Sequence, residues 1–206
     1  KIFTKKDLQK MGMGGILAVN AGSATEAKMV VLEYEPRGRN KKEGPTVIVG
    51  KGVIFDSGGY NLKPSSSLNE MQLDMAGAAA VMGVFRLLKR LDIKQHVVGI
   101  FPLTDNAIGS NAQKPSEVIT TYNGTTVEIT NTDAEGRLIL CDALSYALKK
   151  YQPRYMIDIA TLTGACMVAL GDRYAGLFGN DKNLMEKLRR AGEAVDELCW
   201  PMPIHP

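Results

Sequence analysis

The feature that most constrains the fold of this 206-residue chain is the alternation of short β-branched apolar runs with longer segments of helical periodicity. Runs bounded by polar or turn-forming residues predict strands at residues 28–34, 46–50, 96–103 and 155–160. Apolar residues spaced by three and four predict helices at residues 68–91, 135–151 and 184–198. Such alternation is typical of an α/β fold, so we expect one domain, residues 1–206, with a mixed, largely parallel β-sheet flanked by helices.

Local signals add a hairpin and a place for the site. Asn123-Gly124 lies between two alternating runs, a pattern that predicts a β-hairpin. Open α/β sheets bind ligands at the carboxyl ends of their strands and in the loops that follow. We therefore expect the functional residues at strand ends.

Charge and cysteine usage argue against several classes of protein. The 25 basic and 22 acidic residues give a net charge of only +3, and basic residues occur in short pairs such as Lys41-Lys42, which argues against nucleic-acid binding. No apolar run approaches the roughly 18 residues of a membrane span, and the first ten residues lack the apolar core of a signal peptide. Cys141, Cys166 and Cys199 are widely spaced, which predicts neither a disulfide framework nor a thiolate zinc site. A reducing, cytoplasmic setting is expected.

The stretch "GKGVIFDSGGYNLK" is the first of three places with conspicuous charged residues. A buried-looking strand delivers Lys51 and, five residues later, Asp56. An ordinary Asp-Ser-Gly-Gly turn beside a surface lysine is an equally good interpretation of this stretch taken alone. A Walker A loop is excluded, because Lys51 is followed by Gly52 rather than by serine or threonine.

The second place is Asp74, within the predicted helix 68–91. The helix face expected to pack on the sheet consists of Met71, Met75, Ala78, Met82, Phe85 and Leu88. Asp74 follows Met71 by three residues and precedes Ala78 by four, so it points with this apolar stripe. A carboxylate is almost never fully buried without a partner. Either a buried lysine or arginine or a metal ion would supply the missing charge.

The third place is "NTDAEGRL". In extended chain Asp133, Glu135 and Arg137 would share one face, and the small residues Ala134 and Gly136 between them leave room for a ligand. An acidic first helical turn, favoured by the helix dipole, is the plainer alternative.

Taken together, four carboxylates from three places would balance two divalent cations. The two histidines are poor candidates for ligands, because His96 opens an apolar strand and His205 lies in the terminal tail.

Four stretches resemble successive signatures of the M17 leucine aminopeptidases, also called cytosol aminopeptidases: "GKGVIFDSGGYNLKP", "MQLDMAGAAAV", "NTDAEGRLILCDAL" and "DIATLTGA". Their order and spacing agree along nearly the whole chain. The resemblance implies a catalytic domain of the zinc-aminopeptidase and phosphorylase-like fold. It also implies that the chain lacks the family's N-terminal domain and the last part of the catalytic domain.

The resemblance further implies a two-metal site made by Lys51, Asp56, Asp74, Asp133 and Glu135. Asp56 and Glu135 match bridging ligands, Lys51 and Asp74 complete the tighter site, and Asp133 serves the more exchangeable one. The ions would be Zn²⁺ or Mn²⁺, with Mg²⁺ as a further option. Lysine binds a metal only as the neutral amine, and two adjacent dications favour that form.

The implied activity is removal of the N-terminal residue from peptides, leucine and other apolar residues being preferred, through attack by a metal-bridged water. Lys63 matches the catalytic lysine that stabilises the developing oxyanion, and Arg137 matches the residue that holds a bicarbonate ion acting as general base. Positions that match the substrate pocket are Met71, Thr161, Leu162 and Gly164. Met71 also lies on the apolar stripe and could equally belong to the core.

The resemblance implies peptide substrates with a free N-terminus and a homo-hexamer for the full-length protein. Two alternatives stay open: a two-metal phosphoesterase, although such sites usually include histidine, and a non-catalytic regulatory or DNA-binding protein on an aminopeptidase scaffold.

Overall fold

The computed structural model describes residues 1–39 and 43–204, so that the Lys41-Lys42 pair and His205 lie outside the described residues. The chain forms two compact units, one spanning Lys1–Thr161 and the other beginning at Leu162. Each unit is described by itself. That both belong to one catalytic domain stays a prediction.

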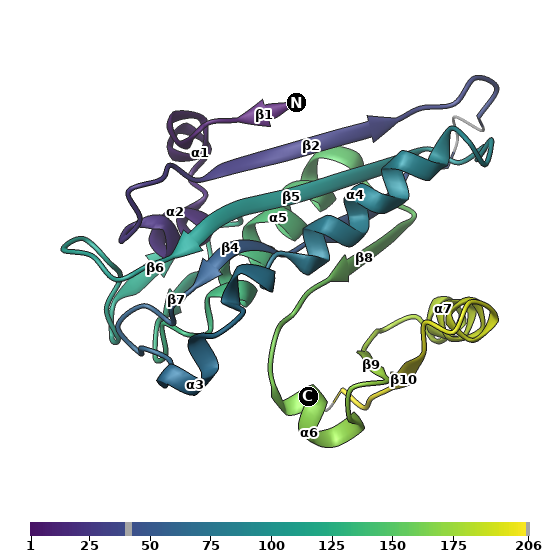
Figure 1. Cartoon of the computed structure of the whole chain (residues 1–206). Coiled ribbons are helices and arrows are strands. Elements are labelled where there is room, and N and C mark those ends of the chain that lie inside the picture. The colour runs from purple at the N-terminus through teal and green to yellow at the C-terminus, as the bar shows by residue number, and fades with distance from the viewer. Residues whose placement is uncertain (40–42, 205–206) are drawn as a thin grey trace. The chain divides into compact units, whose positions relative to one another are not determined.

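A mixed β-sheet forms the centre of the first unit. Among its described residues six strands take part: β1 (Ile2–Phe3), β2 (Lys28–Tyr34), β3 (Thr46–Gly50), β4 (Gly52–Asp56), β5 (Val97–Asn106) and β8 (Tyr155–Ile159). Their order is β1-β2-β5-β3-β8, and β4 also pairs with β5 (Figure 1). β3, β4 and β8 join the sheet through parallel pairs, whereas β1 and β2 join it through antiparallel pairs. The predicted mixed, largely parallel sheet is confirmed.

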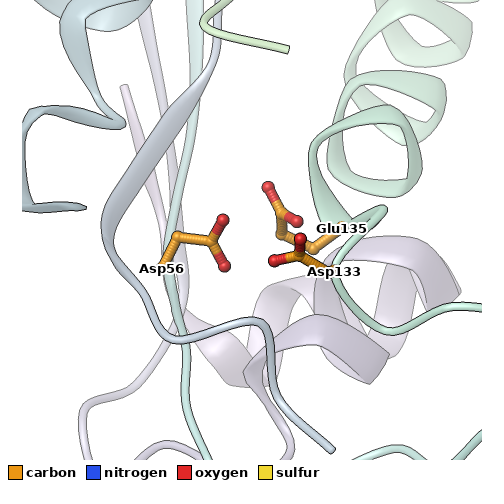
Figure 2. A group of neighbouring side chains, drawn as sticks. All are labelled: Asp56, Asp133 and Glu135. Carbon is orange, nitrogen blue, oxygen red and sulfur yellow. The ribbon is translucent and has the colours of Figure 1, made fainter. Parts of the chain in front are cut away.

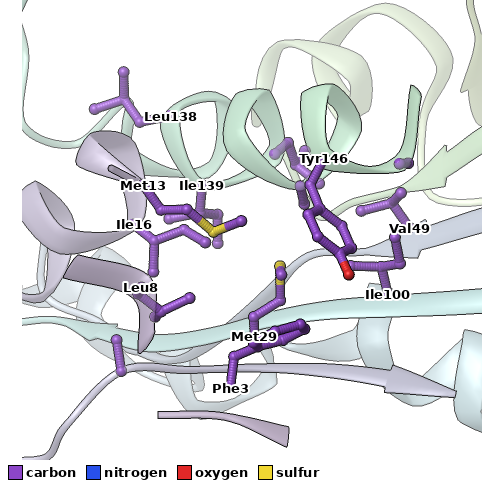
Figure 3. Packing of buried hydrophobic residues seen from close by; sticks show 14 of the residues in the cluster. Phe3, Leu8, Met13, Ile16, Met29, Val49, Ile100, Leu138, Ile139 and Tyr146 are labelled. Atoms are coloured by element: carbon purple, nitrogen blue, oxygen red, sulfur yellow. The ribbon is translucent and has the colours of Figure 1, made fainter. Parts of the chain in front are cut away.

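Helices cover both faces of this sheet. The larger core packs α1 (Lys5–Met11), α2 (Gly14–Asn20) and α5 (Glu135–Tyr151) against one face (Figure 3). A smaller core packs α4 (Ala76–Leu88) against the other. Because successive strand residues point to opposite faces, Ile100 of β5 belongs to the first core and Phe101 to the second. Burial on both faces explains why these strands are continuously apolar.

Most predicted elements are present close to their predicted bounds. β2, β3 and α5 coincide with residues 28–34, 46–50 and 135–151. The central strand β5 continues three residues past the predicted end, to Asn106. The hairpin is confirmed as the antiparallel pair β6 (Val118–Thr120) and β7 (Thr126–Glu128), with Gly124 in the left-handed conformation at φ 90°.

The single helix predicted at residues 68–91 is wrong. The segment is divided into α3 (Ser65–Leu68), a 3₁₀ turn η1 (Met71–Leu73) and α4, and Asp74 precedes α4 instead of lying on its face. The reason is tertiary: the Ala78 N–H donates to the carbonyl of Lys51 at 2.9 Å, so the residue between β3 and β4 replaces the preceding helical turn as acceptor. Met82, predicted to pack on the sheet, is 45% exposed.

The second unit contains α6 (Ala165–Leu170), β9 (Ala175–Leu177), α7 (Lys182–Ala194) and β10 (Cys199–Pro201), and its two strands pair in parallel. The helix predicted at residues 184–198 begins two residues earlier, where the Asp181 side chain caps it, and ends at Ala194. Within the described part of the chain, no helix combines the length and apolar character needed to cross a membrane.

Candidate metal and catalytic site

Polar residues gather where parallel strands of the first unit end. Asp56 is the last residue of β4, and its Cα partner Asn106 is the last residue of β5. Lys51 lies at the break between β3 and β4, where its N–H donates to the carbonyl of Ile159 at 2.9 Å. The fold thus brings these polar residues to strand ends, and that they form the functional site stays a prediction.

A close approach of helix and strand fixes the backbone at Lys51. A Cβ on Gly77, in the first turn of α4, would lie only 2.0 Å from the carbonyl oxygen of Ile159. Any larger residue would therefore push α4 away from this strand end. The glycine lets the helix begin directly beside Lys51, and Asp74 immediately before it reaches the same point.

The Lys51 side chain is 2% exposed and is surrounded by oxygen atoms. Its Nζ lies 2.7 Å from Asp74 Oδ2 and 2.8 Å from Glu135 Oε1. It also donates to the carbonyl oxygen of Thr161 at 2.8 Å. Sequence reasoning left two partners open for Asp74, a buried basic residue or a metal; the structure provides the lysine, which is itself a candidate metal ligand.

Three of the four carboxylates of this cluster are deeply buried, whereas the Asp133 side chain is 32% exposed. Asp56 and Glu135 are each 2% exposed, and Asp74 is 7% exposed. Burial raises the pKa of Asp74, although its contacts with Lys51 and Thr161 oppose the shift. Burial likewise raises the pKa of Glu135, opposed by the charge of Lys51. The shifts mark carboxylates whose negative charge is only partly compensated.

Lys63 supplies the second cation of the cluster. Its Nζ lies 2.9 Å from Asp56 Oδ2 and 2.6 Å from Asp133 Oδ1. Burial alone would lower the pKa of Lys63, but hydrogen bonds to Asp133 and Asp56 and the charges of both carboxylates raise it above its ordinary value. The Lys63 side chain therefore stays an ammonium at neutral pH.

The arrangement fits divalent cations. Asp56, Asp133 and Glu135 each place a carboxylate oxygen within 4.8 Å of the other two, and Figure 2 shows the three side chains pointing toward one space. The buried atoms Asp74 Oδ2 and Asp133 Oδ1 each pair with a lysine ammonium, at 2.7 Å and 2.6 Å, and no other donor among the described residues reaches them. Four carboxylates against two lysines leave a formal charge of −2. Oxygen-rich donor sets of this kind suit Mn²⁺, Mg²⁺ and Zn²⁺.

The prediction that Arg137 shares one face with Asp133 and Glu135 is wrong. The helix α5 begins at Glu135, and residues two apart on a helix are separated by about 200° around its axis. Glu135 is consequently buried, whereas Arg137 is exposed and forms no hydrogen bond or ion pair with residues 1–39 or 43–204. Asp133 can join Glu135 because it precedes the first helical turn.

The predicted pocket residues have different surroundings. Met71 is half-buried in η1, so that neither the pocket nor the core interpretation is decided. Thr161 donates its hydroxyl to Asp74 Oδ1 at 2.7 Å, which makes it a partner of the candidate metal ligands. Leu162 is 45% exposed and Gly164 precedes α6; both belong to the second unit, and their role stays a prediction.

Sequence reasoning missed the uncharged residues that hold this cluster in place. Asn106 is 1% exposed and donates to Asp56 Oδ1 at 2.8 Å and to the carbonyl of Thr132 at 3.1 Å. Thr132 is fully buried and bonds with Asn61. One signal was available: polar residues end an otherwise apolar strand at Asn106. Thr132 lies inside "NTDAEGRL", but only the charged residues of that stretch were identified as candidates.

Fold and site together define an α/β domain whose strand ends carry a carboxylate and lysine cluster suited to divalent cations. A family model described as the catalytic domain of the cytosol aminopeptidase family matches residues 1–206, and the chain belongs to this family. The chain is 52% identical over 203 residues to a probable cytosol aminopeptidase of Chlorobaculum tepidum, covering 98% of this chain and 40% of that protein. A probable cytosol aminopeptidase of Nitratidesulfovibrio vulgaris is 48% identical over 204 residues, which are 99% of this chain and 40% of the relative. The chain thus spans about two fifths of the length of these curated relatives.

Proposed function

We propose that the intact protein is a metal-dependent aminopeptidase that removes the N-terminal residue, leucine or another apolar residue by preference, from peptides in the cytoplasm. The observation that carries the proposal is the convergence of Lys51, Asp56, Asp74, Asp133 and Glu135 from four separate segments onto one buried cluster. The family to which the chain belongs supports the same activity. We further propose that the intact protein forms a homo-hexamer.

The five residues of this cluster are proposed to hold two divalent cations, Zn²⁺ or Mn²⁺ or alternatively Mg²⁺. Asp56 and Glu135 are proposed as shared ligands because they match the family's bridging positions, and their burial at 2% exposure is compatible with that role. Lys51 and Asp74 would complete one position and Asp133 the other. When bound, such cations supply a Lewis acid for the scissile carbonyl and activate water for attack.

Lys63 is proposed to stabilise the negative charge that develops on the carbonyl oxygen during hydrolysis. The basis is the match to the family's catalytic lysine, together with its position between Asp56 and Asp133 at the edge of the cluster. The exposed residue Arg137 is proposed to hold bicarbonate, whose planar shape matches that of the guanidinium, so that bicarbonate receives and returns the proton. Met71, Thr161, Leu162 and Gly164 are proposed as substrate-binding residues because they match the family's positions.

The proposal is tested with the intact protein and leucine p-nitroanilide, in metal-free buffer and after addition of Mn²⁺ or Zn²⁺. We expect metal-dependent release of nitroaniline and no cleavage of N-acetyl-leucine p-nitroanilide, which lacks a free amine. The Glu135→Gln variant should lose both activity and tightly bound metal. Cleavage of p-nitrophenyl phosphate but not of the leucine substrate would make the protein a phosphoesterase, and DNA binding without any hydrolysis would make it a regulatory protein.

A further inference from the structure

The loop that carries Lys63 is fastened to the segment before α5 by two uncharged residues. The Asn61 N–H donates to Thr132 Oγ1 at 2.8 Å, and the Thr132 N–H donates to Asn61 Oδ1 at 2.8 Å. The Thr132 hydroxyl in turn donates to the carbonyl oxygen of Gly58 at 2.6 Å. The Thr132 hydroxyl also lies 3.1 Å from Asn61 Oδ1, so that four hydrogen bonds join one threonine to two points of the loop.

The loop is shaped to meet this threonine. Gly58 and Gly59 both adopt left-handed conformations, with φ of 87° and 65°, which turn the chain back after β4. The Lys63 N–H then donates to the carbonyl of Ser57 at 3.0 Å and closes the loop on itself. A Cβ on Gly58 would lie 2.9 Å from Asp133 Oδ1, so the loop lies directly against a candidate metal ligand.

The segment that receives the loop is itself fixed. Asn106 donates from one amide nitrogen to Asp56 Oδ1 at 2.8 Å and to the carbonyl oxygen of Thr132 at 3.1 Å. Asn106 and Thr132 are at most 1% exposed, so these bonds do not compete with water. Thr132 is therefore a rigid anchor rather than one end of a mobile contact.

The side-chain contacts of Lys63 cannot by themselves hold the loop during the proposed reaction. Its ammonium contacts Asp56 and Asp133, and both carboxylates are candidate metal ligands. A cation that took those oxygens would weaken the two ion pairs. The bonds between Asn61 and Thr132 use neither carboxylate and would persist.

We propose that Asn61 and Thr132 form a clamp that positions Lys63 for catalysis, an inference that rests on the proposed aminopeptidase function. The two residues act through the loop backbone and touch neither substrate nor metal. Removal of the clamp should leave the Lys63 ammonium chemically intact but misplaced, and small misplacements of a catalytic group are costly in rate.

The test uses the intact, Mn²⁺-loaded protein and the Thr132→Val variant, which keeps the shape of the side chain but removes the hydroxyl. Thr132→Ser restores the hydroxyl and should recover activity. Thr121→Val is the matched control, because Thr121 is also buried, at 2% exposure, and its hydroxyl donates to Asn123 and Thr125 in the hairpin. Asn61→Ala, in an exposed part of the loop, tests the clamp from its other side if Thr132→Val does not fold.

For Thr132→Val we expect kcat to fall by about 10- to 100-fold, with KM within about twofold of wild type and full metal content. Amide hydrogen exchange of the peptide spanning residues 57–63 should accelerate about tenfold, since the Asn61 N–H loses its acceptor. Thr121→Val should change neither kcat nor the exchange rate of residues 57–63.

If the wild-type protein is active and Thr132→Val keeps the wild-type kcat, or loses no more of it than Thr121→Val does, the proposed role of the clamp is wrong. A wild-type protein that cleaves no leucine substrate would instead overturn the proposed function, while unchanged exchange in Thr132→Val would independently overturn the clamp.

Discussion

Replacement of Lys51 by methionine tests how the buried cluster is stabilised in the absence of metal. Methionine has nearly the length of lysine but carries no charge. Lys51 Nζ lies 2.7 Å from Asp74 and 2.8 Å from Glu135, and all three side chains are at most 7% exposed. The variant therefore leaves two buried carboxylates without the cation that they share.

The magnitude follows from burial. Loss of one partner from a buried ion pair costs about 3–5 kcal/mol of unfolding free energy, because the remaining charge is uncompensated. Lys94→Met is the matched control: Lys94 pairs with Asp92 at 2.6 Å, but the two side chains are 69% and 77% exposed. Exposed pairs contribute only about 0–1 kcal/mol. We expect the same chemical change to be several-fold more costly at position 51.

The cost should also depend on pH. Burial already raises the pKa of Asp74 and of Glu135, and Lys51 opposes both shifts. Without Lys51 both folded-state pKa values rise further above their unfolded values, so the folded variant binds protons that the unfolded chain does not. Its stability then increases as the pH falls, by about 1.4 kcal/mol per pH unit for each proton taken up. The loss of unfolding free energy in Lys51→Met, relative to wild type, should therefore be smaller at pH 5.5 than at pH 7.5.

The assay is urea unfolding of the metal-free intact protein, followed by far-ultraviolet circular dichroism at both pH values. Hydrogen exchange of the peptide spanning residues 135–147 assigns the loss to the unit that contains the cluster. Equal losses for Lys51→Met and Lys94→Met, or a deficit that grows toward low pH, would refute the electrostatic reasoning.

Three further variants probe the fold and the proposed chemistry. Gly77→Ala should destabilise the protein by roughly 2 kcal/mol or more and weaken metal binding, because its Cβ would lie 2.0 Å from the carbonyl oxygen of Ile159. Gly83→Ala in the same helix should stabilise the protein by up to about 1 kcal/mol, because its Cβ would have no atom within 4 Å. Equal effects of the two variants in thermal unfolding would contradict this reasoning. Asp142→Asn should lower the unfolding free energy by about 1–3 kcal/mol in urea. The two carboxylate oxygens of Asp142 accept the N–H groups of Ile16 and Tyr122, and an asparagine amide can satisfy only one of them. An unchanged unfolding midpoint would show that the amide is accommodated. Arg137→Lys should lower kcat and abolish stimulation by added bicarbonate. The unfolding midpoint should stay unchanged, since Arg137 is exposed. If the variant responds to bicarbonate as the wild-type protein does, Arg137 has no part in the mechanism.

The sequence determined those elements whose residues carry their own periodicity. β2, β3 and α5 were predictable because burial on both faces of a strand, or on one face of a helix, leaves a repeating apolar pattern. The acidic residues were identifiable too, because an aspartate or glutamate beside apolar neighbours needs compensation wherever the chain goes. Asp133 and Glu135 could be paired in advance because they are neighbours in the chain.

Only the tertiary structure decided where the helical segments before Leu88 break and which side chains meet. The carbonyl of Lys51 accepts the N–H of Ala78 in the first turn of α4, a contact between segments that no local pattern encodes. Arg137 was misplaced because two residues project to one side in a strand but to nearly opposite sides in a helix, and the helix starts at Glu135. The clamp of Asn61 and Thr132 joins positions 71 residues apart through neutral hydrogen bonds, which leave no periodic trace in the sequence. Local pattern thus fixed the elements and the need for charge compensation, whereas the partners that provide it depend on packing between distant segments.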